Sequence, residues 1–477
     1  MDAEVGAVTN GKFAVGSTAK FGIKDKIGYM FGDFGNDFTF IFSSMFLMVF
    51  YTKVMGVGAG MVGTMFLVCR IIDAFTDVAM GRIVDTVKPA KDGRFRPWIR
   101  RMAAPVAIAS FLCYQSGLAD MSYTFKVVYM FATYILWGSI FYTSINIPYG
   151  SMASAISPEA ADRAALSTFR SLGASLAGLV IGVGAPLIIY SSDAQGNKII
   201  EGGRFTLIAG IFSVLAIVCY LLAYFLTTER VKVAPATAQK TEKVSAGATI
   251  KAIFTNRALL GIIVSAIFLL LAMLLTQTMN QYLFADYFKN IKALSTISFL
   301  GMLPTFILAP FAVKITSKFG KKESAIVAML VAAAAYILLF FMKVQNAYVF
   351  TAISFIVNLG MGWFNLIIWA NITDVIDYQE IKTGKREDGT VYAVYSFSRK
   401  LGQALAGGLG GWVLAFIGYN SKVKVQPESV TTGIYNAATL IPGLCFLVVA
   451  LALAFIYPLT KKKVLANIET LKERHNA

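Results

Sequence analysis

Apolar runs of about 20 residues recur along nearly the whole chain, and each is long enough to cross a lipid bilayer as a helix. Hydrophobic residues make up 57% of the 477 residues, charged residues make up only 14%, and the mean hydropathy is +0.66. The alternating segments of about ten residues that form outer-membrane barrels do not occur in the sequence. The sequence therefore predicts an all-α polytopic membrane protein.

The apolar pattern places twelve transmembrane helices along the chain. Lys and Arg are concentrated in alternate connections, such as KPAKDGRFRPWIRR after the second helix and KKK after the twelfth. Since basic loops stay on the cytoplasmic side, we expect both termini in the cytoplasm and the protein in a cell membrane, the bacterial inner or plasma membrane. The expected helices are 26–53, 59–86, 97–118, 123–154, 160–191, 204–228, 257–287, 294–318, 322–343, 347–379, 388–419 and 431–460.

The longest internal polar stretch, ERVKVAPATAQKTEKVSAG, begins at Glu229 and divides the chain into two sets of six helices. Two such halves facing each other around a central cavity form the arrangement of many secondary transporters. The expected organisation is a cytoplasmic N-terminal tail over 1–25, a six-helix bundle over 26–228, a cytoplasmic linker over 229–256, a second six-helix bundle over 257–460 and a cytoplasmic C-terminal tail over 461–477.

The composition argues against several classes of function. The net charge of +17 comes from basic residues scattered between apolar runs, so it reports membrane topology and predicts no nucleic-acid partner. The four cysteines lie in apolar stretches without metal-ligand spacing, and the single histidine, His475, lies in the C-terminal tail. The HExxH and GxSxG motifs do not occur. We expect no metal, no cofactor and no enzymatic activity, and any proton chemistry must use carboxylates.

The second expected helix carries charge at a depth where lipid makes charge costly. In RIIDAFTDVAMGRIVD, residues 70–85, Arg70, Asp73 and Asp77 have i, i+3, i+7 spacing and share one stripe near mid-bilayer. A charged side chain at a helix centre costs about 2.5–3.5 kcal/mol on insertion scales, so the stripe must face protein or water. It can be an Arg–Asp clamp between helices, or a carboxylate pair that carries a proton or binds a cation.

Two further groups of charged residues lie at the expected membrane edge. Arg82 and Asp85 adjoin the basic loop after the second helix, where a gate or a loop-anchoring ion pair is expected. Asp374, Asp377 and Glu380 follow i, i+3, i+6 spacing near the cytoplasmic end of the tenth helix. They are compatible with a gate and equally with a solvated helix end paired with basic residues of the KTGKR loop.

Other helices bring polar side chains to a similar depth. Each amide or tyrosine taken singly can be a hydrogen bond between helices, but basic residues at depth require carboxylate or water partners, and Asp37, Asp73 and Asp77 are the candidates. Together they describe a polar cavity with the mixed donors and acceptors that bind sugars. The residues are Asn36 and Asp37 in the first helix, Tyr142, Thr143 and Asn146 in the fourth, Arg170 in the fifth, Asn365 and Asn371 in the tenth, and Arg399 and Lys400 in the eleventh.

These residues stand in motifs that resemble a known family. RIIDAFTDVAMGRIVD followed by GRFRPW, with GDFGNDF, INIPYGSM, ITDVIDYQE and SFSRKLGQALAGG, is similar to the glycoside-pentoside-hexuronide:cation symporters, the melibiose permease branch of the major facilitator superfamily. The resemblance spans all twelve helices, and the motif forms are nearest those of the isoprimeverose, other pentoside and glucuronide permeases. It implies the major facilitator fold, with two six-helix halves around a central cavity.

The resemblance also implies site residues. The family's cation site corresponds to Asp73 and Asp77, with Thr76 and Thr143 as oxygen ligands. Its sugar site corresponds to Asp37, Asn36, Tyr142, Asn146, Arg170, Asn365, Tyr395, Ser396 and Lys400. Asn36, Asn146, Gly150 and Asn365 replace charged or tryptophan side chains of melibiose permease, so the sugar or its pose should differ. Thr76 replaces an asparagine that helps to hold sodium there, which favours protons as the coupling ion.

The sequence thus predicts proton-coupled symport of a glycoside or pentoside such as isoprimeverose by alternating access. Sodium-coupled symport of a galactoside or glucuronide is the alternative. A lysolipid carrier would need a largely apolar cavity, which Arg170, Asn146 and Asn365 argue against. The expected partners are a small glycoside, a coupling cation and the lipid bilayer, and the pocket residues do not identify the sugar.

Overall fold

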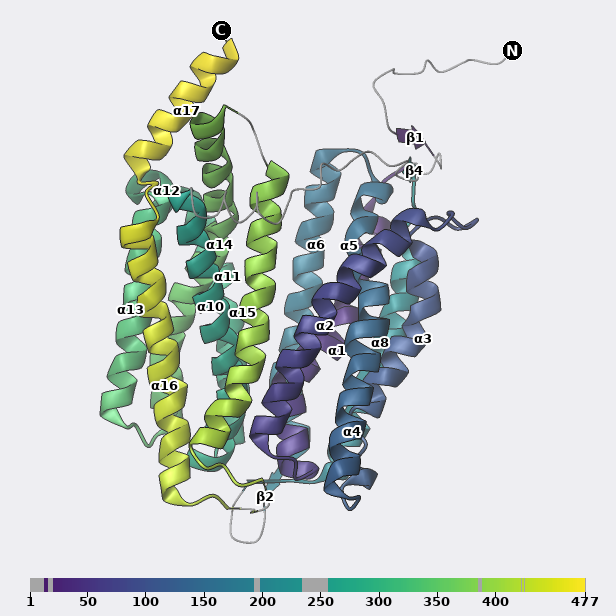
Figure 1. The fold of residues 1–477 in the computed structure, drawn as a ribbon, viewed down its shortest axis with the longest axis vertical. Coiled ribbons are helices and arrows are strands. Elements are labelled where there is room, and N and C mark those ends of the chain that lie inside the picture. Colours follow the sequence, from purple (N-terminus) through teal and green to yellow (C-terminus); the bar gives the residue numbers. More distant parts are fainter. Residues whose placement is uncertain are drawn as a thin grey trace.

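The computed structural model describes residues 13–15, 20–192, 198–233, 256–384, 388–421, 423 and 425–476, and it consists mainly of long helices (Figure 1). In the N-terminal half the helical elements are α1 (Ile23–Val49), η1 (Phe50–Val54), α2 (Ala59–Thr86), α3 (Arg96–Leu112), η2 (Ser116–Leu118), α4 (Tyr123–Tyr134), η3 (Ile135–Tyr142), α5 (Thr143–Ile156), α6 (Ala160–Leu179), η4 (Val180–Gly184), α7 (Ala185–Ile189) and α8 (Gly202–Leu226).

The C-terminal half repeats this pattern of long helices extended by short π-helical or 3₁₀ turns. Its elements are α10 (Arg257–Tyr282), η5 (Leu283–Tyr287), α11 (Ile291–Leu308), η6 (Ala309–Phe311), α12 (Ala312–Phe319), α13 (Lys321–Met342), α14 (Ala347–Thr383), α15 (Asp388–Phe416), α16 (Glu428–Leu451), η7 (Ala452–Ile456) and α17 (Lys461–Asn476). Four short strands pair in two antiparallel ribbons, β1 (Phe13–Val15) with β4 (Val231–Val233) and β2 (Tyr190–Ser192) with β3 (Lys198–Ile200).

Joined where a turn continues a helix, these elements form the twelve expected membrane spans. Ten of them are long and apolar enough by composition to cross a membrane, counted over the described residues. The other two, α3 and α15, run alongside them, and α15 packs against α2 and α10 (Figure 1). The all-α polytopic prediction is therefore confirmed.

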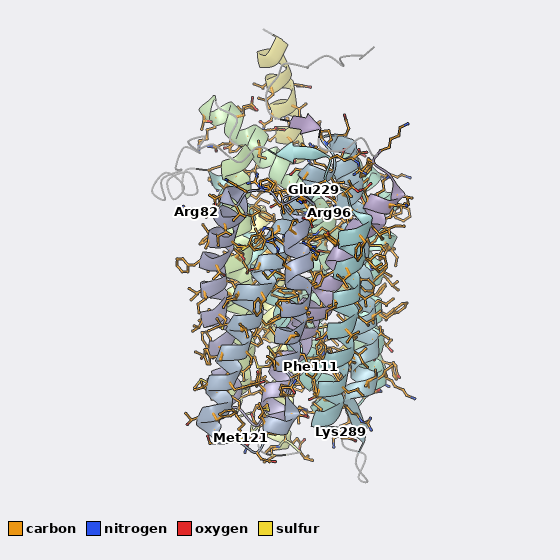
Figure 2. All side chains as sticks on the ribbon, turned by 90° about the vertical axis from the view of Figure 1, so that its right-hand side faces the viewer. Arg82, Arg96, Phe111, Met121, Glu229 and Lys289 are labelled. Carbon is orange, nitrogen blue, oxygen red and sulfur yellow. The ribbon has the colours of Figure 1, made fainter. Side chains whose placement is uncertain are left out.

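The spans form two bundles. Strand β1, near the N-terminus, and helix α17, near the C-terminus, lie on one face of the molecule, here called the terminal face (Figure 1). Viewed from the side, Arg82, Arg96 and Glu229 lie toward the terminal face, whereas Met121 and Lys289 lie at the opposite end (Figure 2). The charged end of α2 and the start of α3 are thus on the same side as the two termini, which the alternation of basic loops predicts.

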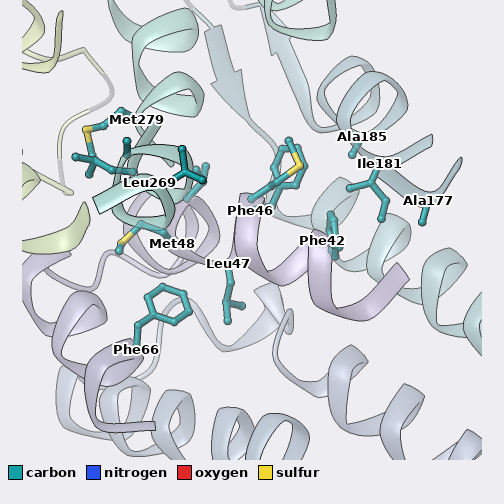
Figure 3. Close-up of a cluster of buried hydrophobic side chains, with 14 of the residues drawn as sticks. Phe42, Phe46, Leu47, Met48, Phe66, Ala177, Ile181, Ala185, Leu269 and Met279 are labelled. Atoms are coloured by element: carbon teal, nitrogen blue, oxygen red, sulfur yellow. The ribbon is translucent and has the colours of Figure 1, made fainter. Parts of the chain in front are cut away.

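Helix α1 occupies a central position in the packing. It contacts α6 and α8 of its own half and α10 of the other half. Figure 3 shows Phe42 and Phe46 of α1 next to Ile181, while Met48 lies toward Leu269 and Met279 of α10. All of these side chains belong to one continuous cluster of buried apolar residues. The apolar core therefore joins the two halves as well as filling each of them.

Small residues allow α2 and α15 to meet across the boundary between the halves. A Cβ atom placed on Gly411 would clash with the carbonyl oxygen of Ala59 and lie 2.7 Å from the Cα of Gly63. Such glycines permit the close backbone approach that stabilises helix pairs in lipid. Larger side chains at this crossing would separate α2, which carries Asp73 and Asp77, from α15, which carries Lys400.

Polar contacts between the halves gather near the end opposite the termini. Lys53 Nζ lies 2.6 Å from Asp286 Oδ1, and both side chains are largely buried. The Thr52 hydroxyl lies 2.8 Å from that of Tyr282, and Ser421 donates to the carbonyl of Val57 at 3.0 Å. The two bundles are therefore closed against each other at this end.

At the terminal face, Glu229 binds the start of α3. Its carboxylate accepts backbone N–H groups from Arg94, Phe95 and Arg96 at 2.7 to 2.8 Å. Gly93 precedes this turn with φ +123°, and a Cβ there would lie 2.6 Å from the carboxylate. Three consecutive donors converging on one anion form a concave anion site of the backbone. The end of α8 is thus fixed to the loop between α2 and α3.

Replacing Glu229 by glutamine is expected to lower the melting temperature of the protein. The neutral amide presents an N–H₂ group to backbone donors that need an acceptor, and an unsatisfied buried donor costs about 1–3 kcal/mol. Glu201→Gln, which changes an exposed carboxylate paired with Arg204, is the matched control and should leave the midpoint nearly unchanged. Thermal unfolding in detergent measures both, and equal midpoints would exclude a stabilising role for the Glu229 contacts.

Asp92 lies in the same loop, outside the membrane spans. Burial alone would raise its pKa, but the hydrogen bond from the Tyr224 hydroxyl at 2.8 Å and the nearby charges of Arg100 and Arg96 outweigh burial and lower the pKa. The carboxylate therefore remains charged at neutral pH and contributes to holding the loop against α8.

The chain ends differ in part from simple tails. Residues 461–476 of the expected C-terminal tail form helix α17, and Phe13–Val15 of the expected N-terminal tail pairs with Val231–Val233. Most of the expected linker, residues 234–255, lies outside the described residues.

Candidate functional site

A polar cavity of about 390 Å³ lies between α2, the span formed by α4, η3 and α5, helix α6 and helix α15. Residues from both halves of the chain line it. They are Phe40, Arg70, Asp73, Ala74, Asp77, Tyr134, Trp137, Gly138, Tyr142, Thr143, Asn146, Arg170, Arg399, Lys400 and Gln403. The stripe predicted on α2 thus faces protein and cavity, because residues 70, 73, 74 and 77 all line this space.

The two carboxylates of α2 have different partners. Asp73 accepts a hydrogen bond from Ser139 at 2.5 Å and lies 3.5 Å from the Arg70 guanidinium. Asp77 accepts from Thr143 at 3.0 Å and from Lys400 Nζ at 2.5 Å. Arg70 and Asp73 both belong to α2, so their contact is not the clamp between helices that the sequence offers as one alternative. The other alternative, a carboxylate pair that carries a proton or binds a cation, stays a prediction. The Lys400–Asp77 pair joins the two halves of the molecule.

A π-helical stretch shapes one wall of the cavity. The eight residues of η3, Ile135–Tyr142, are wound wider than an α-helix, and Trp137, Gly138 and Tyr142 from it line the cavity. Its Ser139 is the residue that donates to Asp73. Wider turns of this kind change which side chains share a face and recur at functional sites.

Arg170 lies at the wall formed by α6. Its Nε donates to Asp33 Oδ1 at 2.9 Å, and its guanidinium lies 5.4 Å from the ring centre of Tyr149. The sequence indicates Asp37, Asp73 and Asp77 as candidate partners of Arg170, but not Asp33. Asp37, one turn farther along α1, is half-buried and close enough to Asp33 and Arg170 to interact electrostatically with both. Asp33 is therefore the direct partner of Arg170.

Aromatic rings cover part of the cavity. Tyr142 stacks on Phe40 with ring centres 5.6 Å apart and an angle of 18° between the planes. Trp137 contacts Tyr142 at 5.8 Å, and the Arg70 guanidinium lies 5.2 Å from the Phe40 ring centre. The rings of Phe40, Trp137 and Tyr142 thus give the cavity aromatic surface. They do so although the resemblance implies that tryptophans of melibiose permease are replaced in this chain.

The structure does not bring every predicted residue to this cavity. Thr76 lies on the flank of the stripe, and its hydroxyl donates to the carbonyl of Asp73 in its own helix at 3.2 Å. Asn36 is buried between helices, where it donates to Asn146 at 3.4 Å and accepts from the Tyr220 hydroxyl at 3.0 Å. Asn36 thus bonds between helices, which is one of the roles that the sequence allows, and Thr76 is not among the residues that line the cavity.

Two more predicted residues line a separate, smaller space. Asn365 and Tyr395 contribute to a cavity of about 70 Å³ between α10, α14 and α15. Arg399 borders both this cavity and the larger one, so it separates the two. Ser396 lies in α15, but its side chain is outside the described part of the structure.

The expected gate residues are placed at the terminal face. Asp374 is buried and pairs with Lys321 of α13 at 2.6 Å. The expected partners of Asp374 lie in the KTGKR stretch, but the observed partner, Lys321, is the first residue of α13. Asp377 lies one turn farther along α14, Arg82 is exposed on α2, and the side chain of Asp85 lies outside the described residues.

Sequence reasoning missed several residues of the site, among them Asp33, Ser139, Trp137 and Phe40. Asp33 lies four positions before Asp37 in GDFGNDF, so the i, i+4 spacing on α1 is a signal that could have found it. Ser139 and Trp137 lie in the apolar run ILWGSIFY, where an α-helical projection gives no reason to single them out. Both belong to the π-helical stretch η3, in which Trp137 lines the cavity and Ser139 donates to Asp73.

Comparison with known proteins gives a consistent result. The family model described as MFS/sugar transport protein matches residues 28–461. The chain is 32% identical to the uncharacterized symporter YjmB of Bacillus subtilis (strain 168), covering 98% of this chain and 99% of that one. It is also 32% identical to the glucuronide carrier protein homolog of Escherichia coli (strain K12), over 92% of this chain and 93% of that one.

Among solved structures, the crystal structure of a D-xylose-proton symporter matches with a TM-score of 0.64. The identity is 14%, and the match covers 92% of this chain and 98% of the other. This likeness concerns the fold, in which two six-helix bundles surround a central cavity. The family match and the two relatives confirm a membrane transporter rather than an enzyme. The chain belongs to the MFS/sugar transport protein family.

Proposed function

We propose that this protein imports a glycoside by symport with a cation, and that Asp73 and Asp77 handle the cation. The observation that carries the proposal is the contact of 2.5 Å between Lys400 and Asp77, which links opposite halves inside the polar cavity. A cation bound at Asp77 competes with Lys400 for the same carboxylate. Binding of the cation therefore weakens one contact between the halves, which couples ion binding to their relative movement.

The coupling ion in this proposal is the proton. The Asp73 and Asp77 carboxylates already have Arg70 and Lys400 beside them, at 3.5 and 2.5 Å. Arg70 and Lys400 already contact oxygens of these carboxylates, which leaves few oxygen ligands for a metal cation, whereas a proton needs only one carboxylate oxygen. The sequence favours protons because of Thr76. The contacts above favour protons independently of Thr76, whose hydroxyl donates to the backbone carbonyl of Asp73 in the same helix.

The charges that line the cavity favour some classes of substrate over others. Four of its lining side chains are cationic and two are anionic: Arg70, Arg170, Arg399 and Lys400 against Asp73 and Asp77. This surplus favours a sugar with an acidic group, and one of the relatives above is called a glucuronide carrier homolog. Glucuronides are therefore the second candidate class, next to neutral glycosides and pentosides such as isoprimeverose. The same charges disfavour a lysolipid tail.

Uptake into proteoliposomes tests the proposal. Vesicles with an imposed pH gradient should accumulate α-xylosides or glucuronides, and a sodium gradient at equal pH should not drive accumulation. Accumulation driven by sodium alone would replace the proton by sodium in the mechanism. Failure of both gradients with xylosides, glucuronides and galactosides would contradict the proposed symport.

Breaking the Lys53–Asp286 pair is expected to open the end opposite the termini. Removing one partner of a buried ion pair costs about 3–5 kcal/mol, here only in the conformation in which this end is closed. With Asp286→Asn, the distance between spin labels at Met121 and Lys292, one on each half, should lengthen. Asp120→Asn, an exposed change in the same region, is the control. Unchanged distances in the Asp286 variant would show that the pair does not stabilise this state.

A further inference from the structure

A second cavity, of about 270 Å³, lies at the boundary between the halves and is separate from the charged one. Residues of α1, α6 and η4 line it from the N-terminal half. Residues of α10, α11, α13 and α14 line it from the C-terminal half. Its lining consists of apolar side chains, such as Met45 and Ile297, of glycines, and of neutral polar side chains, such as Gln281 and Asn358. None of these described lining residues carries a charge.

The polar atoms of this cavity come mainly from side-chain amides on one helical face. Gln277, Asn280 and Gln281 have i, i+3, i+4 spacing on α10, and Asn358 of α14 joins them. Gln281 is fully buried, and neither atom of its amide has a hydrogen-bond partner among the described residues. A buried amide left without partners is costly, so its presence on a cavity wall requires a reason.

Chain geometry places the two cavities next to each other. Arg170 lines the charged cavity and Ala174 lines the uncharged one, and the two residues are one turn apart on the same face of α6. On α1, the neighbouring residues Phe40 and Ile41 line the charged and the uncharged cavity, respectively. Four residues of helix rise by about 6 Å, which is of the order of one sugar ring.

We propose that the uncharged cavity is a second ligand subsite, which binds an additional neutral, hydroxylated ring of the substrate. The inference rests on the proposed glycoside symport and narrows its substrate class to glycosides of at least two rings. Amides offer both donors and acceptors to hydroxyl groups, and the surrounding methionine, isoleucine and tyrosine side chains match the apolar faces of a pyranose. The charged cavity then binds the first ring and the coupling ion.

The position of the subsite gives it a role in the transport cycle. Two glycines of the N-terminal half lie close to α11 of the other half. A Cβ atom placed on Gly178 would clash with the methyl group of Met302. A Cβ atom placed on Gly182 would lie 3.1 Å from the Cβ of Ser298. A ring bound among these residues touches both halves at once. A two-ring ligand therefore favours a conformation in which the halves are close, whereas a single ring in the charged cavity lacks these contacts.

The test uses Gln281→Met and ligand pairs that differ by one ring. Each pair is a disaccharide and the methyl glycoside of its non-reducing sugar: isoprimeverose with methyl α-xyloside, melibiose with methyl α-galactoside, and a glucuronosyl-glucose with methyl glucuronide. In wild type we expect the disaccharide of the accepted pair to bind about tenfold more tightly than its methyl glycoside. A hydrogen bond and the burial of a second ring together account for a difference of this size. In Gln281→Met this advantage should fall to about twofold or less, with methyl glycoside binding unchanged.

Methionine removes an unpartnered buried amide while retaining similar volume, so the variant should fold and melt no lower than wild type. Gln115→Met is the matched control, because Gln115 lies in a loop outside both cavities and donates to the carbonyl of Phe111. Asn358→Leu repeats the test from α14 if the first variant is not obtained. A disaccharide advantage that survives both substitutions, or that is missing in wild type, would overturn the subsite. Failure of every sugar to bind would instead contradict the proposed function.

Discussion

Asp77→Asn is expected to abolish uphill accumulation of the sugar while leaving sugar exchange intact. Asparagine retains the side-chain shape and can still accept from Thr143, but it cannot take up a proton or pair as an anion with Lys400. Without a cation to couple, the transporter can only equilibrate its substrate, so the final ratio of inside to outside concentration should be about one. Uptake under an imposed pH gradient and counterflow exchange in the same vesicles measure the two processes separately.

Asp120→Asn, an exposed change near the end opposite the termini, serves as control and should accumulate sugar as wild type does. If exchange and accumulation are both lost, the Asp77→Asn substitution disrupts the cavity. The double variant Asp77→Asn with Lys400→Gln, which restores the charge balance, is then measured in its place. Uphill accumulation that persists in either variant would refute the role of Asp77.

Arg170→Gln is expected to weaken sugar binding by about tenfold to a hundredfold. Hydrogen bonds that involve a charged group contribute about 1.5–3 kcal/mol, and Arg170 is a cationic donor on the cavity wall. The side chain is partly exposed, at 41%, so donors remain available to a ligand beyond its bond to Asp33. Arg204→Gln, which removes an arginine paired with Glu201 away from the cavity, is the matched control. Isothermal titration with the accepted glycoside measures both.

A second variant distinguishes direct binding from positioning. If Arg170 contacts the sugar, Asp33→Asn should weaken binding less than Arg170→Gln does, because the guanidinium remains in the cavity. If Asp33 itself were the ligand and Arg170 only held it, the order of the two effects would be reversed. Arg170→Lys should recover part of the affinity at most, since one ammonium cannot reproduce the planar guanidinium that reaches Asp33 and the cavity together.

Linkage connects these two predictions. If the proton at Asp77 and the sugar at Arg170 favour the same conformation, each must increase the affinity for the other by the same factor. A higher proton concentration should therefore raise the sugar affinity of wild type, and the Asp77→Asn variant should lose this dependence. The Arg170→Gln variant should keep it, although its affinity is lower throughout.

Four of the residues that the sequence identifies in the site are charged at positions where lipid would surround an isolated helix. Asp73, Asp77, Arg170 and Lys400 all line the charged cavity or bind to each other there. The cost of charge in hydrocarbon is large enough that helical spacing alone predicts an inward-facing stripe. Neutral residues carry no comparable penalty, so their spacing predicts less. Tyr142, Thr143 and Asn146 line the charged cavity, whereas Asn36, Thr76, Asn365 and Tyr395 are not among its lining residues.

The partners of the charged residues required the folded chain. Arg170 binds Asp33 rather than Asp37, although both carboxylates lie on the same face of α1 one turn apart. Ser139, which donates to Asp73, lies in the π-helical stretch η3, and no apolar pattern signals such a stretch. Gln281 lies in an ordinary apolar span, and only the packing of both halves shows that its amide is buried beside a cavity without a partner among the described residues.

The sequence by itself determined the membrane environment, the twelve helices and the polar stripe on α2. Each of these follows from local hydropathy and from the free energy of placing charge in lipid, which depend on residues close together in the chain. Only the tertiary structure decided which helices share a cavity, which carboxylate each cation binds and where the two halves meet. Those contacts join residues as distant as Asp77 and Lys400, and their geometry depends on glycine crossings and π-helical turns rather than on hydrophobicity.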